Sequence, residues 1–216
     1  MQFIDLKKQQ NLIRKNIEKS IHRVLDHGKY IQGPEVFELE EKLCDYLSVK
    51  HCISCASGTD ALLIPLLAKK IGKGDAVLTT PFTYIATAEV IKLVGATPVF
   101  VDIYEDTYNI DPGKIDEAIK FAKRKDLKPK AIIPVDLFGL PARYRLIEQK
   151  SKEHNLFILE DAAQGFGGEI KNKKAGAFGN VSSTSFFPAK PLGCYGDGGA
   201  IFTNDDKLAN VMRSIR

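Results

Sequence analysis

The sequence predicts an α/β protein, a three-layer α/β/α sandwich in which a mostly parallel seven-stranded sheet lies between two layers of helices. Short apolar segments alternate with segments of helical periodicity, a rhythm typical of parallel sheets covered by helices. The strand segments are apolar at consecutive positions, as expected for strands buried on both faces. The predicted strands are 51–55, 76–79, 97–101, 130–135, 156–160, 181–185 and 199–203.

Helices are predicted between the first five strands, whereas the last two strands are joined by a loop. That connection, 186–198, is rich in Pro and Gly and has no room for a crossover helix. A parallel pair needs such a crossover, so the strand at 199–203 is predicted to run antiparallel. The predicted helices are 58–70, 83–94, 112–124 and 141–154.

Residues 1–33 are predicted to form an N-terminal helix and loop, ahead of one large domain at 34–216. Residues 8–27 carry apolar side chains at helical spacing, and Gly28 ends that helix. Pro34 is suited to the first position of a second helix, which reaches about Leu47.

Composition indicates a folded protein of mild charge. The chain has 216 residues, of which 44% are hydrophobic, and 31 Lys and Arg against 27 Asp and Glu give a net charge of +4. The densest basic cluster, within 120–130, holds few aromatics and indicates a solvated helix end and loop, so no nucleic-acid partner is predicted. No apolar run approaches the length of a membrane helix, and no membrane partner is predicted.

The cysteines give no metal or disulfide framework. Cys52 and Cys55 form a CxxC pair, but a second pair at similar spacing, which a structural zinc site needs, is absent from the sequence. We therefore interpret them as small buried thiols and expect no metal site. Without disulfides or an apolar signal segment, the sequence indicates a cytoplasmic protein.

Ligands of open α/β sheets bind beyond the carboxyl ends of the strands. After the first strand, Gly58 permits a tight turn, and its N–H and that of Thr59 begin a helix. Free N–H groups and the helix dipole favour a phosphate there. Taken alone, this stretch is more typical of an ordinary helix cap. After the second strand, Tyr84 or Phe82 could stack on a flat ring or simply pack in the core.

Two adjacent acids, Glu160 and Asp161, end the buried fifth strand. Buried carboxylates are costly unless they are paired or take part in chemistry. Asp161 could pair with a buried cation such as the protonated pyridine nitrogen of pyridoxal phosphate (PLP), and Gln164, one helical turn further on, could reach a ring substituent. The alternative is that Asp161 only caps a helix.

Lys190 follows the sixth strand and is flanked by Phe186, Phe187, Pro188 and Pro191. Apolar surroundings lower the pKa of a lysine and free its amine as a nucleophile, as a Schiff-base lysine requires. Ser185 could donate to a phosphate. A surface lysine that extends its amine into solvent is the alternative. No single motif decides between these interpretations, but their combination at the end of one sheet favours a PLP site.

These motifs together resemble the DegT/DnrJ/EryC1/StrS family of fold type I, PLP-dependent aminotransferases that act on nucleotide-linked sugars. The segment from Lys190 onward and the opening Phe3-Ile4-Asp5-Leu6 are most similar to the branch that aminates the 3-keto position of UDP-N-acetyl-glucuronic acid derivatives, in bacterial surface polysaccharide synthesis. The matching stretches are 28–35, 56–62, 81–84, 160–164 and 185–193.

The resemblance implies a role for each candidate residue. Lys190 matches the Schiff-base lysine and the proton-transfer catalyst, Asp161 the partner of the pyridine nitrogen, and Gln164 the contact to the ring hydroxyl. Tyr84 matches the aromatic over the ring. The residues that match phosphate ligands are Gly58, Thr59 and Ser185. The implied substrates are glutamate and a UDP-linked keto-sugar, with PLP as cofactor.

The resemblance also implies parts that this sequence does not contain. Family members have a C-terminal small domain and a homodimeric site that includes a phosphate-binding Asn from the partner, downstream of position 216. We therefore expect 34–216 to be the PLP-binding large domain without the small domain. An inactive fragment and a PLP-binding regulatory protein remain alternatives. Lys190 argues against a related sugar dehydratase, in which histidine replaces the lysine.

Overall fold

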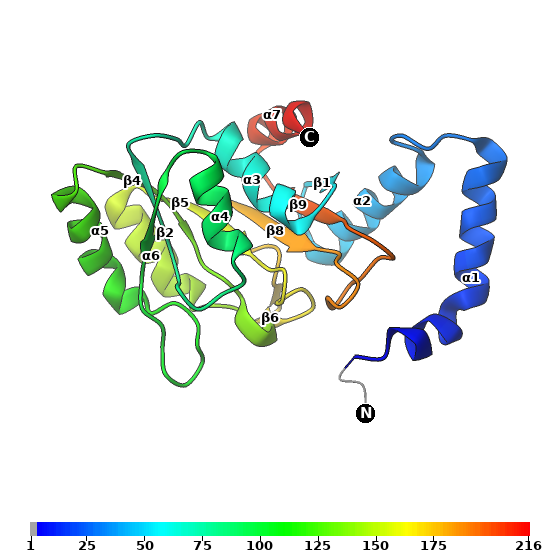
Figure 1. Ribbon diagram of the computed structural model, residues 1–216, viewed down its shortest axis with the longest axis horizontal. Coiled ribbons are helices and arrows are strands. Elements are labelled where there is room, and N and C mark those ends of the chain that lie inside the picture. The colour runs from blue at the N-terminus through cyan, green and yellow to red at the C-terminus, as the bar shows by residue number, and fades with distance from the viewer. Residues whose placement is uncertain (1–3) are drawn as a thin grey trace.

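The computed structural model describes residues 4–216, and Phe3 of the opening motif lies outside them. Seven strands form one sheet in the order β1-β9-β8-β5-β4-β2-β3 (Figure 1). A separate two-stranded hairpin, β6 and β7, lies in the loop that follows β5. The strands are β1 (His51–Cys55), β2 (Asp75–Thr79), β3 (Thr97–Phe100), β4 (Lys128–Ile133), β5 (Phe157–Asp161), β6 (Glu169–Ile170), β7 (Lys173–Lys174), β8 (Val181–Ser185) and β9 (Gly199–Thr203).

The large sheet is parallel except at β9. This strand pairs antiparallel with β8 on one side and with β1 on the other. Every other pairing in the sheet is parallel. The carboxyl ends of β1, β2, β4, β5 and β8 therefore share one edge, and the segments that follow them are brought close together.

Helices cover both faces of the sheet, so the predicted three-layer sandwich is confirmed (Figure 1). α3, α4 and α7 lie on one face, and α2, α5 and α6 lie on the other. The helices are α1 (Leu6–His27), α2 (Pro34–Leu47), α3 (Gly58–Ala68), α4 (Ala86–Leu93), α5 (Ile115–Arg124), α6 (Tyr144–His154) and α7 (Asp206–Ile215), with short 3-10 turns η1 (Pro112–Lys114) and η2 (Leu137–Gly139).

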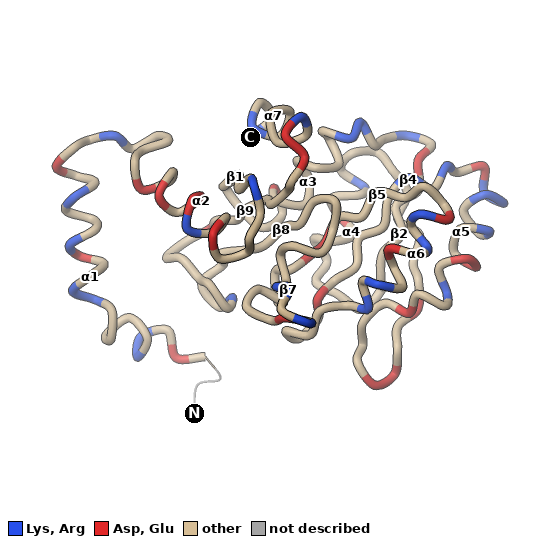
Figure 2. The backbone as a smooth tube through the Cα atoms, turned by 180° about the vertical axis from the view of Figure 1, so that it is seen from behind, with Lys and Arg blue, Asp and Glu red and all other residues tan. Residues whose placement is uncertain are grey.

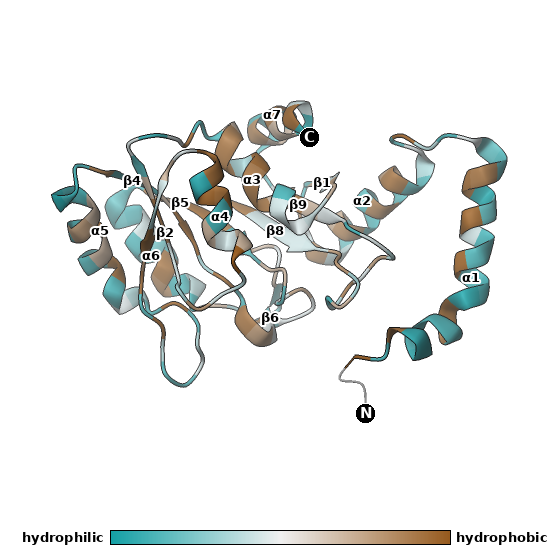
Figure 3. Cartoon of the chain, viewed as in Figure 1, coloured by the Kyte–Doolittle hydropathy of each residue, from teal (hydrophilic) through white to brown (hydrophobic). Residues whose placement is uncertain are grey.

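The alternation of side chains along each strand divides the core between the two faces. In β2, Val77 packs with the residues of α3 and α4, while Leu78 packs with those of α5 and α6. α3 is apolar after its first turn (Figure 3), and five of its residues are buried. Both faces of the central strands are therefore dry, which explains their continuous apolar sequence.

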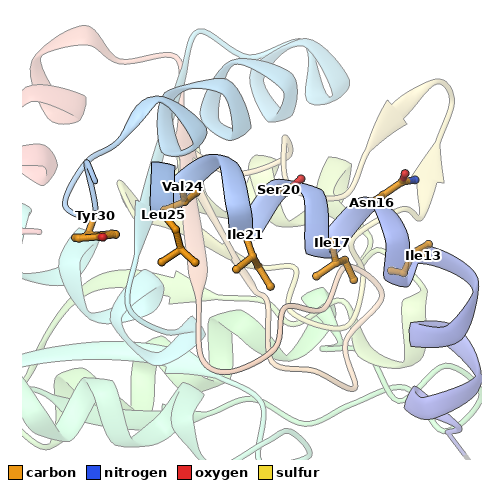
Figure 4. A pocket seen from close by; sticks show the side chains of 8 residues that line it. All are labelled: Ile13, Asn16, Ile17, Ser20, Ile21, Val24, Leu25 and Tyr30. Atoms are coloured by element: carbon orange, nitrogen blue, oxygen red, sulfur yellow. The ribbon is translucent and has the colours of Figure 1, made fainter. Parts of the chain in front are cut away.

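α1 lies apart from the sheet (Figure 1) and has no buried residue. The side chain of Asp5 caps its N-terminus, and Gly28 ends it in the left-handed conformation with φ of 67°. Figure 4 shows its apolar side, where Ile17, Ile21 and Leu25 border a shallow hollow together with Tyr30. Since 22 residues gain so little burial here, tertiary packing within this chain contributes little to the stability of the helix.

Most of the predicted elements are confirmed, including the antiparallel direction of the last strand. The helix expected at 83–94 begins only at Ala86, and the one expected at 141–154 begins at Tyr144. The hairpin at 169–174 was not predicted. Its two strands have two residues each, and Lys171 and Asn172 between them adopt positive φ. Such a short polar segment carries no alternating apolar pattern that could reveal it.

The basic cluster is solvated as the sequence indicated, whereas of the two CxxC thiols Cys52 is buried and Cys55 is only partly buried. Acidic and basic residues alternate along the chain without a large segment of one sign (Figure 2), and the basic side chains of 120–130 are exposed. All four cysteines are free. Burial raises the pKa of the Cys55 thiol to about 12 and that of Cys52 still higher, so both stay protonated. Within residues 4–216, no helix is both long and apolar enough to cross a membrane.

A pair of buried acids lies beneath the carboxyl ends of β4 and β5. Glu160 accepts hydrogen bonds from the N–H groups of Gly176, Phe178 and Gly179 and from the Ser182 hydroxyl, at 2.6 to 3.3 Å. Asp136 is fully buried. Its Oδ1 accepts from the Ala142 N–H and the Tyr144 hydroxyl, while no group within residues 4–216 donates to Oδ2. Burial, and next the charge of Glu160, raise the pKa of Asp136 well above 3.8.

We predict that the parent protein loses stability as rising pH ionises Asp136, and that Asp136→Asn does not show this loss. A raised pKa means that the fold favours protonated Asp136, so its stabilising effect is complete below pH 3.8 and is lost as the pH rises through the elevated pKa. Asparagine imitates the protonated acid at every pH. Urea unfolding at a series of pH values should show that, at high pH, the free energy of unfolding of the variant exceeds that of the parent by more than about 1 kcal/mol. Parallel stability curves for the two proteins would contradict this explanation.

Candidate active site

One pocket of about 410 Å³ opens at the carboxyl edge of the sheet. The segments that follow β1, β2, β5 and β8 meet there, as the topology requires. All seven site residues predicted from the sequence line this pocket. They are Gly58, Thr59, Tyr84, Asp161, Gln164, Ser185 and Lys190. The structure therefore brings together side chains that are up to 132 positions apart in the chain, the separation from Gly58 to Lys190.

The first residues of α3 form one end of the pocket. The Ser57 side chain caps the helix by accepting from the Asp60 N–H at 3.0 Å, and the N–H groups of Gly58 and Thr59 belong to the first helical turn, whose N–H groups have no carbonyl partner within a helix. Gly58 also approaches β8 closely, because a Cβ built on it would lie 2.5 Å from the Cβ of Ser185. Only glycine permits this approach, which places the Ser185 hydroxyl beside the helix N-terminus.

The Ser185 hydroxyl is oriented by its own backbone. Its Oγ accepts from the Phe187 N–H at 3.2 Å, so its proton is free to donate toward the pocket. Together with the N–H groups of Gly58 and Thr59, it gives this end of the pocket three donors for a ligand. Such a site favours an anion, and the positive end of the α3 dipole adds to that preference.

Asp161 lies in the floor of the pocket with only 5% of its surface exposed. Its Oδ1 accepts from the Ala163 N–H at 3.1 Å and its Oδ2 from the Thr87 hydroxyl at 2.9 Å. Burial raises the pKa of this carboxyl, while those two hydrogen bonds and then the Lys190 charge lower it. The carboxylate is therefore held in a fixed orientation at a site where a further cation would stabilise it.

The turn after Asp161 differs from the expected helix. Residues 163–167 form successive turns, so Asp161 caps no helix, and the helical spacing assumed for Gln164 was wrong. Gly165 explains the turn, since a side chain there would collide with Asp136. Gln164 still reaches the pocket. Its Oε1 accepts from the Phe138 N–H at 3.2 Å, which leaves its NH₂ group available as a donor.

The surroundings of Lys190 also differ from the expectation. Phe186, expected to surround the amine, packs instead into the core with Leu47 and Phe202 on the opposite face of the sheet. Phe187 does line the pocket but is 52% exposed. Successive residues leaving a strand point to opposite sides, so two adjacent phenylalanines could not both shield Lys190. Lys190 is partly buried, and its charge acts on the Asp161 carboxyl.

Sequence reasoning missed several residues of the pocket. Thr87 is fully buried beside Asp161, and Thr83, Val135 and Asp197 also line the cavity. Thr87 and Asp161 are 74 positions apart, and a threonine in a helical segment carries no sign of its partner. Asp197 lies in the glycine-rich loop before β9 and lines the same pocket as Lys190.

Comparison with known proteins places this pocket in a family. The family model described as "DegT/DnrJ/EryC1/StrS aminotransferase family" matches residues 11–216. The UDP-2-acetamido-2-deoxy-3-oxo-D-glucuronate aminotransferase of Pseudomonas aeruginosa is 52% identical over 215 residues, covering 100% of this chain and 58% of that protein. The chain belongs to the DegT/DnrJ/EryC1/StrS aminotransferase family.

Solved structures of this family agree with the fold. A DegT/DnrJ/EryC1/StrS aminotransferase from Brucella abortus matches with a TM-score of 0.97 and 54% identity, over 100% of this chain and 58% of that one. NtdA from Bacillus subtilis, solved with bound cofactor PMP, has a TM-score of 0.89 and 33% identity, over 98% of this chain and 47% of that one. The chain thus spans about half the length of these family members.

We predict that Gly58→Ala disrupts the junction between α3 and β8. The added methyl group must displace Ser185 or the start of α3, and overpacking of this kind costs about 1–3 kcal/mol. Urea unfolding measures the loss. Gly72→Ala is the matched control, because a Cβ there would meet only the Val94 carbonyl at an ordinary 3.4 Å. Equal stability of the two variants would show that the close approach imposes no constraint.

Proposed function

We propose that this protein is a PLP-dependent aminotransferase that moves an amino group, with glutamate as donor, to the keto group of a UDP-linked sugar. The observation that carries the proposal is a single pocket that combines an anion-binding helix N-terminus, a buried carboxylate and a lysine amine. The family membership and the similarity to the Pseudomonas aeruginosa protein support the reaction class and the substrate.

The donor groups fit the cofactor's phosphate. Gly58 and Thr59 would bind it through their N–H groups and Ser185 through its hydroxyl. The close contact between Gly58 and Ser185 places these donors near one another. All of them are uncharged groups. A phosphate dianion bound there gains from the aligned N–H groups and from the helix dipole.

The remaining residues fit the ring. Asp161 would accept a hydrogen bond from the protonated ring nitrogen, and this added cation would offset the burial that raises the pKa of its carboxyl. The free NH₂ group of Gln164 would donate to the ring oxygen. Tyr84, which is exposed and lines the same pocket, would cover a face of the ring.

Lys190 would hold the cofactor through its amine and then act as acid and base. When bound, PLP supplies an electron-withdrawing ring that stabilises negative charge at the substrate carbon. Lys190, once released, would carry the proton at that carbon, a general acid–base role that contributes about 10²–10⁴-fold to rate. Its position in the same pocket as Asp161 supports both roles.

The wider setting follows from the same family. We propose that residues 34–216 are the PLP-binding large domain and that 1–33 form an N-terminal helix and loop. The working unit would be a homodimer in the cytoplasm, with its product used for surface polysaccharide such as lipopolysaccharide O-antigen. Size measurement by light scattering and the sugar product identified by mass spectrometry would test these proposals.

Lys190→Ala should abolish covalent attachment of PLP. Borohydride reduction makes the lysine link permanent, and peptide mapping by mass spectrometry locates it on the parent protein. The variant has no amine in the pocket, so it should retain no reduced cofactor, whereas Lys92→Ala on α4 should label like the parent. A label on another lysine would overturn the assignment of Lys190.

Asp161→Asn should keep the fold but slow the reaction with glutamate. The neutral amide cannot match the ring cation, and a hydrogen bond to a charged group contributes about 1.5–3 kcal/mol, or about tenfold to a hundredfold. Stopped-flow absorbance of the cofactor with glutamate measures the rate. Asp206→Asn, a largely exposed acid on α7, serves as control. Unchanged rates in the Asp161 variant would remove it from the mechanism.

A further inference from the structure

A chain of threonine hydroxyls leads from the pocket wall to Asp161. The Thr83 and Thr87 hydroxyl oxygens lie 3.0 Å apart, and Thr87 Oγ1 lies 2.9 Å from Asp161 Oδ2. Thr87 is 1% exposed, while Thr83 lines the pocket. The Thr87 hydroxyl also lies 3.2 Å from the Tyr84 carbonyl oxygen. Three possible partners therefore surround a hydroxyl that has a single proton.

That single proton couples the arrangement to the charge of Asp161. When Asp161 is ionised, Thr87 donates to the nearer Oδ2 and accepts from Thr83, and hydrogen bonds in such a row strengthen one another. When Asp161 is protonated, Oδ2 becomes a weaker acceptor for the Thr87 hydroxyl, and the longer contact at the Tyr84 carbonyl competes for the hydroxyl proton. The hydroxyl row therefore favours the charged carboxylate.

The same residue joins two parts of the pocket. The Thr87 N–H donates to the Tyr84 carbonyl at 3.2 Å, so both its backbone and its side chain contact the segment that carries Tyr84. On the far side it holds Asp161 at the end of β5. Thr87, at the start of α4, thus contacts both the backbone of the Tyr84 segment and the carboxylate.

We propose that Thr87, supported by Thr83, is a positioning residue that holds the Asp161 carboxylate ionised and aimed into the pocket, and that it sets the distance between Asp161 and the Tyr84 segment. The role in cofactor binding rests on the proposed function, whereas the effect on Asp161 does not. The charge that acts on this carboxylate is that of Lys190, which favours ionisation, while Asp197 is a further acid that lines the same pocket.

The test compares Thr87→Val, which keeps the shape and removes the hydroxyl, with Thr87→Ser, which keeps the hydroxyl. The control is Thr79→Val, because Thr79 is also fully buried and its hydroxyl donates to the Ile133 carbonyl at 2.9 Å, away from the pocket. Carbon-13 NMR of labelled aspartate carboxyls follows the titration of Asp161 in cofactor-free protein. The resonance is identified by its absence in Asp161→Asn.

The expected result has two parts. Thr87→Val should move the Asp161 titration to higher pH and weaken PLP binding, measured by fluorescence titration, about tenfold, the effect of losing one hydrogen bond to a charged group. Thr87→Ser and Thr79→Val should match the parent within about twofold. A Thr87→Val protein that titrates and binds PLP like Thr79→Val would overturn the proposal.

The two measurements also separate this inference from the proposed function. If the parent binds no PLP, the cofactor assignment fails, and the Asp161 titration alone decides whether Thr87 holds the carboxylate ionised. If PLP binds but the titration does not move in Thr87→Val, the cofactor assignment stands and the positioning role is refuted.

Discussion

The fold depends on placing two adjacent carboxylates, Glu160 and Asp161, at the end of a buried strand. Neighbouring side chains on a strand point to opposite faces, so the two cannot share donors. Glu160 gathers the backbone N–H groups of the loop before β8, and Asp161 gathers a hydroxyl from α4 and its own turn. A buried carboxylate without hydrogen-bond donors is costly. Glu160 therefore constrains the loop before β8, and Asp161 constrains the start of α4.

The two acids also have different roles, since one is structural and the other faces the pocket. The Glu160 side is closed by backbone donors and by the acid Asp136, so it serves the structure alone. The Asp161 side opens into the pocket with donors on both oxygens but with burial still opposing its charge. A cation that enters the pocket therefore meets the Asp161 carboxylate in a fixed orientation and can stabilise its charge.

The sequence was sufficient for what depends on local pattern. Apolar runs located the strands, the loop at 186–198 predicted the antiparallel strand, and the rule about strand ends selected the pocket segments. The sequence was insufficient where a tertiary contact determines the direction of a side chain, its role or the course of a turn. The direction of Phe186 depends on its place in the strand exit, and the role of Thr87 depends on a carboxylate 74 positions away. The turn after Asp161 depends on the space that Asp136 leaves beside Gly165.

The position of β9 has a consequence for how the chain folds. β1 pairs with β9 alone, and His51 lies opposite Thr203. On a ribosome, β1 has no partner until residues 199–203 have emerged, about 150 residues after it was made. Cys52 and Ile53 can pack against α2 and α3 early, but the backbone of β1 has no strand to pair with during that interval, although β2, β3, β4 and β5 can already pair. Contacts so distant in sequence close slowly, so β1 and α2 join a sheet that has formed without them.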